Sequence, residues 1–390
     1  MVHLAETLDD DNLRCDALIA LADMFLVTEN ILSRELARAA VAIAQRLNDP
    51  VREGRALRCV GWKAWVRHDY HESLSALETA VARFRQAGLT GHAAECMHML
   101  SLVTGMQGLG KPAISQKYAE DAIQLSRAAK DRRHEAIGMR RLAIVFMDLG
   151  EYNKSLEIAQ QVLPLHRELG DRYEEDMALN AIAVNLSWMD RKEEAKTLFQ
   201  QAFDIECEIH SIIGIWMVFA NMQWFVYRRE GRYEAGLAFA NQQLENPEFV
   251  DNPFLSMNIQ YLKATLLQNL GQYQQALDIL EEVRKIAYHF AGALVQVDRY
   301  LTAAMNQTEL HNFTAAREAL AEARERSQKL ERANDTAMIL VTDAEISRRE
   351  WEAGNLPQLQ RAVAHIDQAV AILRGTSWFF DLAYTLQVAA

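Results

Sequence analysis

Two short segments of the chain carry residue types that could do chemistry. From Gly105 to Lys111 the sequence is Gly-Met-Gln-Gly-Leu-Gly-Lys, which satisfies the first seven positions of the phosphate-binding pattern GxxxxGK[ST]. The eighth position is Pro112, so the hydroxyl that would ligate magnesium is missing, and no strand pattern precedes the segment. We therefore predict a turn between two helices here rather than a nucleotide site.

The second segment places His92 and Cys96 one helical turn apart, with His98 two residues further along. A zinc site usually needs three or four ligands and a second shell that orients them. No other Cys or His lies within the same repeat, as defined below. We predict ordinary packing and surface roles for these side chains, and no metal ion or other cofactor in this chain.

No other pattern in the sequence predicts catalysis. A nucleophile elbow, a pair of catalytic carboxylates and a glycine-rich dinucleotide loop are all missing from the sequence. The acidic runs Glu174 to Asp176 and Glu193 to Glu194 fall at expected helix N-termini, where carboxylates complement the helix dipole. We predict that the chain is not an enzyme, and an enzyme acting through the His/Cys segment is the disfavoured alternative.

Composition indicates what kind of elements position these residues. The 390 residues include only 17 Gly and 6 Pro, which argues against turn-rich β folds and disordered chains. Acidic residues outnumber basic ones 53 to 41, so a nucleic-acid partner is disfavoured. The four cysteines show no CxxC pair, and neither a signal-peptide pattern nor an apolar run long enough for a membrane span is present. We expect an all-α, cytoplasmic protein with no membrane contact.

A regular repeat organises the whole chain. A glycine or polar residue followed after one spacer by an aromatic recurs, as in Gly150-Glu151-Tyr152 and Gly271-Gln272-Tyr273. Nine such anchors, degenerate copies included, lie near residues 28, 68, 110, 150, 190, 231, 271, 311 and 354, at spacings of 40, 42, 40, 40, 41, 40, 40 and 43. Eight of the nine residues five positions after an anchor are small, as two closely crossing helices require. Each repeat is therefore predicted to be a helical hairpin.

The pattern of these hairpins resembles the tetratricopeptide repeat (TPR). The segment from Leu142 to Tyr152 is similar to the TPR consensus, with Ala143 at the motif glycine. Trp224 and Leu21 depart from the pattern at that small position. The long period resembles the TPRs of kinesin light chains, Rap-type phosphatases and the sensor domains of MalT-like activators. The resemblance implies a right-handed α-solenoid of about nine hairpins over residues 1–374.

The last residues begin a further helical pattern. Residues 375–390 contain Trp378, Phe380 and Leu382, which would make a poor polar cap for a solenoid. We expect either a capping helix or, preferably, the first helix of a tenth repeat in a chain cut from a longer protein.

The resemblance also implies a ligand surface, because the first helix of each TPR hairpin lines a concave groove. Over all nine repeats the inward positions hold five arginines against one acid, Asp298, whereas random placement would give about five acids. The expected partner-binding residues at these positions are Arg55, Arg58, Trp62, Trp65, Arg140, Asn180, Asn221, Phe225, Arg228 and Tyr261. Asn180 and Asn221 could clasp a peptide backbone or bond to neighbouring helices, and Trp62 and Trp65 could anchor a ligand or belong to the core.

The sequence thus predicts a binding module whose partner is a protein or peptide segment with acidic and apolar side chains. A sugar or a second copy of the chain is also compatible with such a groove. We expect the sensory or regulatory input region of a larger signalling protein, such as a cyclase, kinase or transcriptional activator. The alternative is a free-standing adaptor or peptide receptor of the Rap type.

Overall fold

The computed structural model describes residues 8–24, 31–66, 69–105, 108–290, 293–328, 333–355 and 358–374. Contacts divide the chain into two compact units, Met1–Met189 and Asp190–Ala390. Within the described ranges the regular secondary structure is helical, which confirms the predicted all-α solenoid class. The anchors near 28 and 68 and the predicted helix at 375–390 lie outside these ranges.

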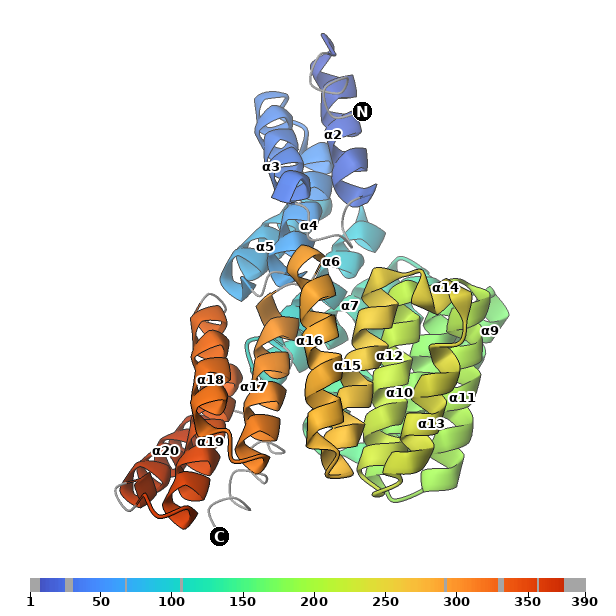
Figure 1. Ribbon diagram of the computed structural model, residues 1–390. Helices are drawn as coiled ribbons and strands as arrows, with labels where there is room; N and C mark the ends of the chain where they lie inside the picture. The colour runs from blue at the N-terminus through green and yellow to red at the C-terminus, as the bar shows by residue number, and fades with distance from the viewer. Residues whose placement is uncertain are drawn as a thin grey trace. The chain divides into compact units, whose positions relative to one another are not determined.

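The first unit is a row of hairpins in which each helix packs on the next one along the chain (Figure 1). Its helices are α2 (Asp11–Met24), α3 (Ile31–Arg46), α4 (Pro50–Val66), α5 (Tyr70–Gln86), α6 (Thr90–Thr104), α7 (Pro112–Ala128), α8 (Arg132–Asp148), α9 (Tyr152–Leu169) and α10 (Arg172–Trp188). The even-numbered helices also contact one another from α2 through α4, α6 and α8 to α10. They form the first-helix layer of this unit, the layer predicted to bind the partner.

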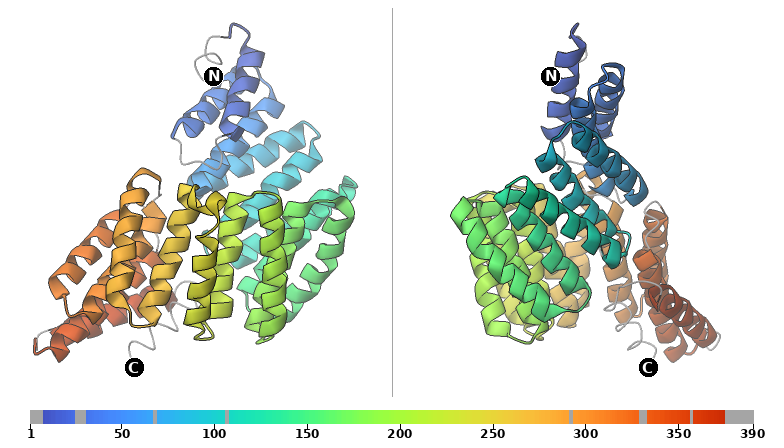
Figure 2. Two further views of the ribbon diagram at one scale, coloured as in Figure 1. Left: turned by 45° about the vertical axis from the view of Figure 1, so that its right-hand side comes forward. Right: turned by 180° about the vertical axis from the view of Figure 1, so that it is seen from behind.

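The second unit continues the same arrangement with one irregularity. Its helices are α11 (Lys192–Glu208), α12 (Ile212–Met222), the π-helix η1 (Gln223–Arg228), α13 (Tyr233–Gln243), α14 (Pro247–Val250), α15 (Pro253–Asn269), α16 (Tyr273–Phe290), α17 (Ala293–Glu309), α18 (Phe313–Ser327), α19 (Ala333–Glu352) and α20 (Gln358–Arg374). Contacts link α12 to α15, α15 to α17 and α17 to α19, so these helices and η1 are the first-helix layer of the second unit. The hairpins stack side by side within the unit (Figure 2).

The described anchors are the turns inside the hairpins, and their backbone explains the preference for glycine. Gly150 and Gly271 have φ angles of 77° and 72°, in the left-handed region that side chains with a Cβ disfavour. Asp190 and His311 adopt the same conformation at the corresponding anchors, with φ of 62° and 60°. A second series of left-handed residues lies between hairpins, at Asn48, Gly88, Lys130, Gly170 and His210.

Small residues lie where the two helices of a hairpin cross, as the repeat pattern predicts. The Ser155 hydroxyl donates a hydrogen bond to the Ala143 carbonyl at 2.6 Å, and Ser73 bonds to Gly61 in the same way at 2.7 Å. A Cβ built on Gly61 would lie 2.6 Å from Cγ of Leu77, so a larger residue would overpack the crossing. The close approach of the helices therefore fixes the register of each hairpin.

In the ninth hairpin the residue predicted to lie at the helix crossing, five positions after the anchor Gly354, is wrong. Leu359, the one large residue at the position five after an anchor, is 40 % exposed, whereas Ala362 is 7 % exposed and packs in the core between α19 and α20. The helix α20 begins at Gln358, four residues after Gly354, while α16 begins at Tyr273, two after Gly271. The buried small residue of the ninth hairpin is therefore Ala362, which lies further from its anchor than in the other hairpins.

The first helix of the sixth hairpin also departs from the predicted register. In place of Trp224, Gln223 lies at the crossing, where its side chain is buried and donates to the Gly236 carbonyl at 3.2 Å. The π-helical turn η1 holds one more residue per turn than an α-helix would, which accommodates the 41-residue spacing between Asp190 and Gly231. Trp224 is consequently rotated out of the hairpin and is 43 % exposed.

Candidate functional site

The arginines predicted for the partner surface of the first unit lie in the first-helix layer but are already ion-paired. Arg55 lies 3.4 Å from Asp16, and Arg58 contacts both Asp23, at 3.2 Å, and Glu95. Each of these acids belongs to the first helix of a neighbouring hairpin. The surface is therefore less positive than the predicted inward positions suggested.

Arg140 is buried rather than presented to a partner. Its residue is 2 % exposed, and its Nε donates to Glu174 at 2.7 Å. Burial raises the pKa of the Glu174 carboxyl, but the charges of Arg140 and Arg141 outweigh it and hold that pKa below its usual value. This pair links α8 to α10 inside the unit.

Two buried histidines accompany this pair. The ring of His98 stacks on that of His134 with 6.1 Å between centroids, and neither ring nitrogen of His98 has a hydrogen-bond partner among the described residues. Burial, followed by the charges of Arg141 and His134, lowers the pKa of His98 to about 3. His166 is fully buried, and burial lowers its pKa as well. Both histidines are therefore neutral parts of the core.

The two tryptophans of α4 lie together at the layer. The ring centroids of Trp62 and Trp65 are 5.2 Å apart. Both side chains are half-buried, and Trp65 packs against the core cluster that contains Leu77 and Phe84. Trp65 is thus at least partly a core residue, and the role of Trp62 as a ligand anchor stays a prediction.

The two predicted asparagines differ in burial. Asn180 on α10 is 7 % exposed, and Asn221 on α12 is half-buried. Each already makes an interaction within the chain. Their role in clasping a peptide backbone stays a prediction.

Around η1 the structure exposes Trp224, which the repeat pattern predicted to lie at the helix crossing. Phe225, predicted to face the partner, is half-buried and stacks on Phe199 of α11 with 6.2 Å between ring centroids. Trp224 lies at the surface instead, and the guanidinium of Arg228 lies over its ring, 4.8 Å from the centroid. The only sequence signal for this exchange was the one-residue excess in the spacing before Gly231.

Tyr261 on α15 lies beside this pair and beside a second arginine. The guanidinium of Arg299 on α17 is 5.6 Å from the Tyr261 ring centroid, and its Nη2 donates to the Asn258 side chain at 3.4 Å. Burial lowers the pKa of Arg299 to about 10, and burial also lowers that of Arg228. Burial is likewise the main cause that raises the pKa of Tyr261 to about 12. Arg299 was not predicted, because it is not at an inward position of its repeat.

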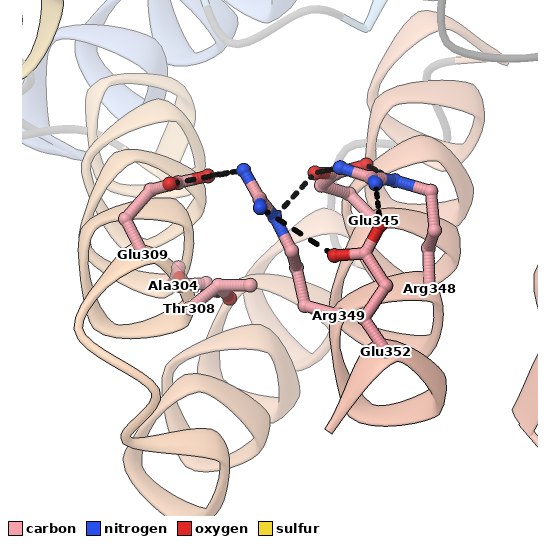
Figure 3. A network of polar contacts seen from close by, with 7 residues as sticks. All are labelled: Ala304, Thr308, Glu309, Glu345, Arg348, Arg349 and Glu352. Carbon is pink, nitrogen blue, oxygen red and sulfur yellow. Dashed lines mark hydrogen bonds and ion pairs between the residues drawn. The ribbon is translucent and has the colours of Figure 1, made fainter. Parts of the chain in front are cut away.

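Several other arginines of the second unit are ion-paired. Figure 3 shows Arg349 on α19 bonded to Glu309 on α17, at 2.8 and 3.0 Å, while Arg348 bonds to Glu345 and Glu352 on its own helix. The carboxylate of Asp343 is fully buried among three arginines of the neighbouring helices: Arg317, Arg324 and Arg361. These networks hold α17 to α20 together.

The two segments with chemically suggestive residues have structural roles. Gly108 to Lys111 form the turn between α6 and α7, which confirms the predicted turn. His92 lies against Phe84, and Cys96 is fully buried.

Among the described residues no group of three or more His, Cys, Asp or Glu side chains is placed to hold a metal ion. In the same part of the chain, none of the helices is both long and apolar enough to cross a membrane.

Comparison with known proteins identifies the repeat. Residues 134–206 match the tetratricopeptide repeat family. No curated protein sequence matches the chain significantly.

Several solved structures share the fold. A Rap protein complexed with Competence and Sporulation Factor is 14 % identical, with a TM-score of 0.56 over 84 % of this chain and 90 % of that one. Yeast Tom70 is 10 % identical, with a TM-score of 0.56 over 98 % of this chain and 90 % of that one. A STAND-type signal transduction ATPase with a tetratricopeptide repeat sensor, from Pyrococcus horikoshii, is 13 % identical and gives 0.56 over 91 % of this chain but 54 % of that one. At these identities the likeness shows the fold alone.

Proposed function

We propose that this chain, which matches the tetratricopeptide repeat family over residues 134–206 and shares the fold of such proteins, acts by binding a protein or peptide segment at its first-helix layers and catalyses no reaction. Stacked hairpins of this kind form extended surfaces to which several repeats contribute. The observation that carries the proposal is the surface around η1. There the exposed indole of Trp224 lies against Arg228, which has no ion-pair partner among the described residues. Aromatic and arginine side chains are the residues that most often dominate binding energy in interfaces.

The proposed context is the sensory or regulatory input region of a larger signalling protein, such as a cyclase, kinase or transcriptional activator. The likeness to the STAND-type ATPase supports this context, because that protein is described as carrying a tetratricopeptide repeat sensor and is matched over 54 % of its length. The alternative is a free-standing peptide receptor, supported by the likeness to the Rap protein in complex with Competence and Sporulation Factor. The reading frame that follows Ala390 distinguishes the two, since an input region is followed by an output domain and a receptor by a stop codon.

We place the protein in the cytoplasm. Its four cysteines are free thiols, and three of them, Cys15, Cys59 and Cys96, are buried in the helical core. Burial raises the pKa of the Cys96 thiol to about 12, so this thiol stays protonated at neutral pH. Unpaired cysteines of this kind fit a reducing compartment.

The binding function is tested with the full chain and a phage-displayed library of random dodecapeptides. We expect enriched peptides whose binding slows hydrogen exchange in first helices such as α4, α6, α12 and α15. The second helices α5, α7 and α16 are the internal control, because they should exchange at unchanged rates. Failure to enrich any peptide above an unrelated helical protein, or protection confined to the second helices, would contradict the proposal.

A further inference from the structure

The buried carboxylate of Asp343 on α19 has more cationic partners than its charge requires. Its Oδ1 accepts a hydrogen bond from Arg317, and its Oδ2 accepts one from Arg324 and one from Arg361, the last at 3.1 Å. Arg317 also pairs with Glu350, so three guanidinium groups face two carboxylates. The ion pairs of the described residues therefore leave one positive charge of this cluster unbalanced.

Arg324 and Arg361, the arginine pair, are the two members that remain open to solvent. They lie on α18 and α20, the second helices of consecutive hairpins, and their side chains are 42 % and 44 % exposed. Each donates a hydrogen bond from Nη2 to the same oxygen of Asp343, so the two guanidinium groups lie next to each other. Their other N–H groups make no hydrogen bond to a described residue and are available to an outside acceptor.

His365 on α20 lies at the same carboxylate oxygen. Its Nδ1 is 3.5 Å from Oδ2 of Asp343, is buried, and has no hydrogen-bond partner among the described residues. Burial lowers the pKa of His365, and the charges of the three arginines lower it further, whereas the Asp343 carboxylate opposes them. The ring is therefore neutral at neutral pH and is close enough to sense any change in the charge of the cluster.

The charges around the arginine pair limit a ligand to one small anionic group. The chain has a net charge of -12, and Glu318 and Glu322 are exposed on the same helix as Arg324. A nucleic acid or an anionic membrane would extend over these carboxylates and be repelled by them. A single phosphate group carries a charge of about −1.5 to −2 at pH 7 and three acceptor oxygens, so it can accept hydrogen bonds from both guanidinium groups.

We infer that the arginine pair, with His365 beside it, forms a binding site for one phosphate group on the second-helix side of the second unit. Both guanidinium groups donate to the phosphate oxygens, while Asp343 orients them from beneath. The site lies apart from the first-helix layers of the proposed function and does not depend on that function. The phosphate is supplied either by a phosphorylated side chain of a protein partner or by free phosphate.

The test titrates the full chain at low salt with inorganic phosphate and with N-acetylphosphoserine amide, and Kd is measured by calorimetry. N-acetylserine amide is the control ligand and should not bind, because it lacks the charged group. We expect both phosphate probes to bind with a Kd of about 1 mM or lower. Tighter binding of the phosphoserine probe by about tenfold identifies a phosphorylated side chain as the source, and equal binding identifies free phosphate.

Arg324→Gln and Arg361→Gln should each weaken phosphate binding about tenfold, because each removes one charged donor. Both positions are partly exposed, and Arg317 still pairs with Asp343 in both variants, so both should melt close to the wild type. The matched control is Arg284→Gln, at an exposed arginine of the second helix α16 that is held by Glu281. It should leave Kd within about twofold.

His365 gives a readout that a purely structural ion-pair cluster would not change. Bound phosphate should raise the pKa of His365, because the anion counteracts the arginine charges that lower it. The ring C–H signals, assigned by their loss in His365→Gln, measure this shift by NMR. The site is overturned if neither phosphate probe binds at about 20 mM, or if both arginine variants keep the wild-type Kd. An unchanged titration of His365 with phosphate bound would place the phosphate elsewhere and overturn it as well.

Discussion

At the scale of single residues, the ionisable side chains of the first unit are mostly structural. Arg140 and Glu174 form a buried pair, so reversing the charge of Arg140 would leave the Glu174 carboxylate buried beside a like charge. Such a substitution would test stability rather than binding. Arg228 is half-buried and has no ion-pair partner among the described residues, so a substitution there would test the proposed partner binding with less cost to stability.

Buried His98 makes the first unit sensitive to acid. The folded state keeps it neutral, with a pKa of about 3, while the unfolded chain takes up a proton below about pH 6.5. The stabilisation is thus complete above about pH 6.5 and is lost as the pH falls towards 3. We expect the free energy of unfolding to drop by up to about 1.4 kcal/mol per pH unit on this account, measured by urea unfolding between pH 7.5 and 5.

The comparison variant is His98→Leu, which removes the titrating group and should make the pH dependence shallower by one proton. Equal slopes for the wild type and His98→Leu would show that His98 is not held neutral.

At the scale of elements, turn residues with left-handed backbones set where one helix ends and the next begins. Lys130 is exposed and has a φ of 55° in the turn between α7 and α8, while Gly88 and Gly170 occupy the corresponding turns. Asp131 follows it and caps α8 by accepting a hydrogen bond from the His134 N–H at 3.1 Å. In this turn the cap by Asp131 stabilises α8, whereas the left-handed backbone of Lys130 is unfavourable for a residue with a Cβ.

We predict that Lys130→Gly stabilises the chain by about 0.5–1 kcal/mol, because glycine adopts the left-handed conformation without the Cβ penalty. Thermal melting followed by circular dichroism measures the effect. Lys130→Ala keeps the Cβ and should give no gain, so equal melting of the two variants would refute the explanation.

At the scale of the whole molecule, stability is local, because each hairpin packs on its neighbours. The buried apolar residues form separate clusters along the chain, such as the one around Ala264, Ala276 and Leu280 in the second unit. A repeat array of this kind should transmit a packing defect only to adjacent repeats.

Ala276→Phe tests this locality. Ala276 is fully buried at the crossing of α15 and α16, so the added ring should destabilise this region by about 1–3 kcal/mol. Hydrogen exchange should accelerate in α15 to α18 and stay unchanged in α4 to α9 of the first unit. Ala235→Phe, at an exposed position of α13, is the control and should change neither region. Acceleration throughout the chain would mean that the molecule unfolds as one cooperative body.

The amino-acid sequence by itself determined the helical class, the repeat period of about 40 residues and the hairpin crossings other than those at Trp224 and Leu359. These features depend on local requirements that recur every 40 residues or so, such as glycine at the left-handed anchor Gly150 and a small side chain at Ser155. Each requirement is visible in the sequence because the residue types that satisfy it are few.

Only the tertiary structure decided which predicted surface residues are available to a partner. Arg58 and Arg140 find their carboxylates 34 to 37 positions away, at Glu95 and Glu174, on first helices of adjacent hairpins. The count of charges at inward positions missed Glu95 and Glu174, because neither residue occupies an inward position of its own repeat. The outward rotation of Trp224 likewise depends on where one extra residue is absorbed, and a π-helical turn and a longer loop give the same spacing in the sequence. Pairing across repeats and local register are set by packing, so they follow from the fold and not from the period.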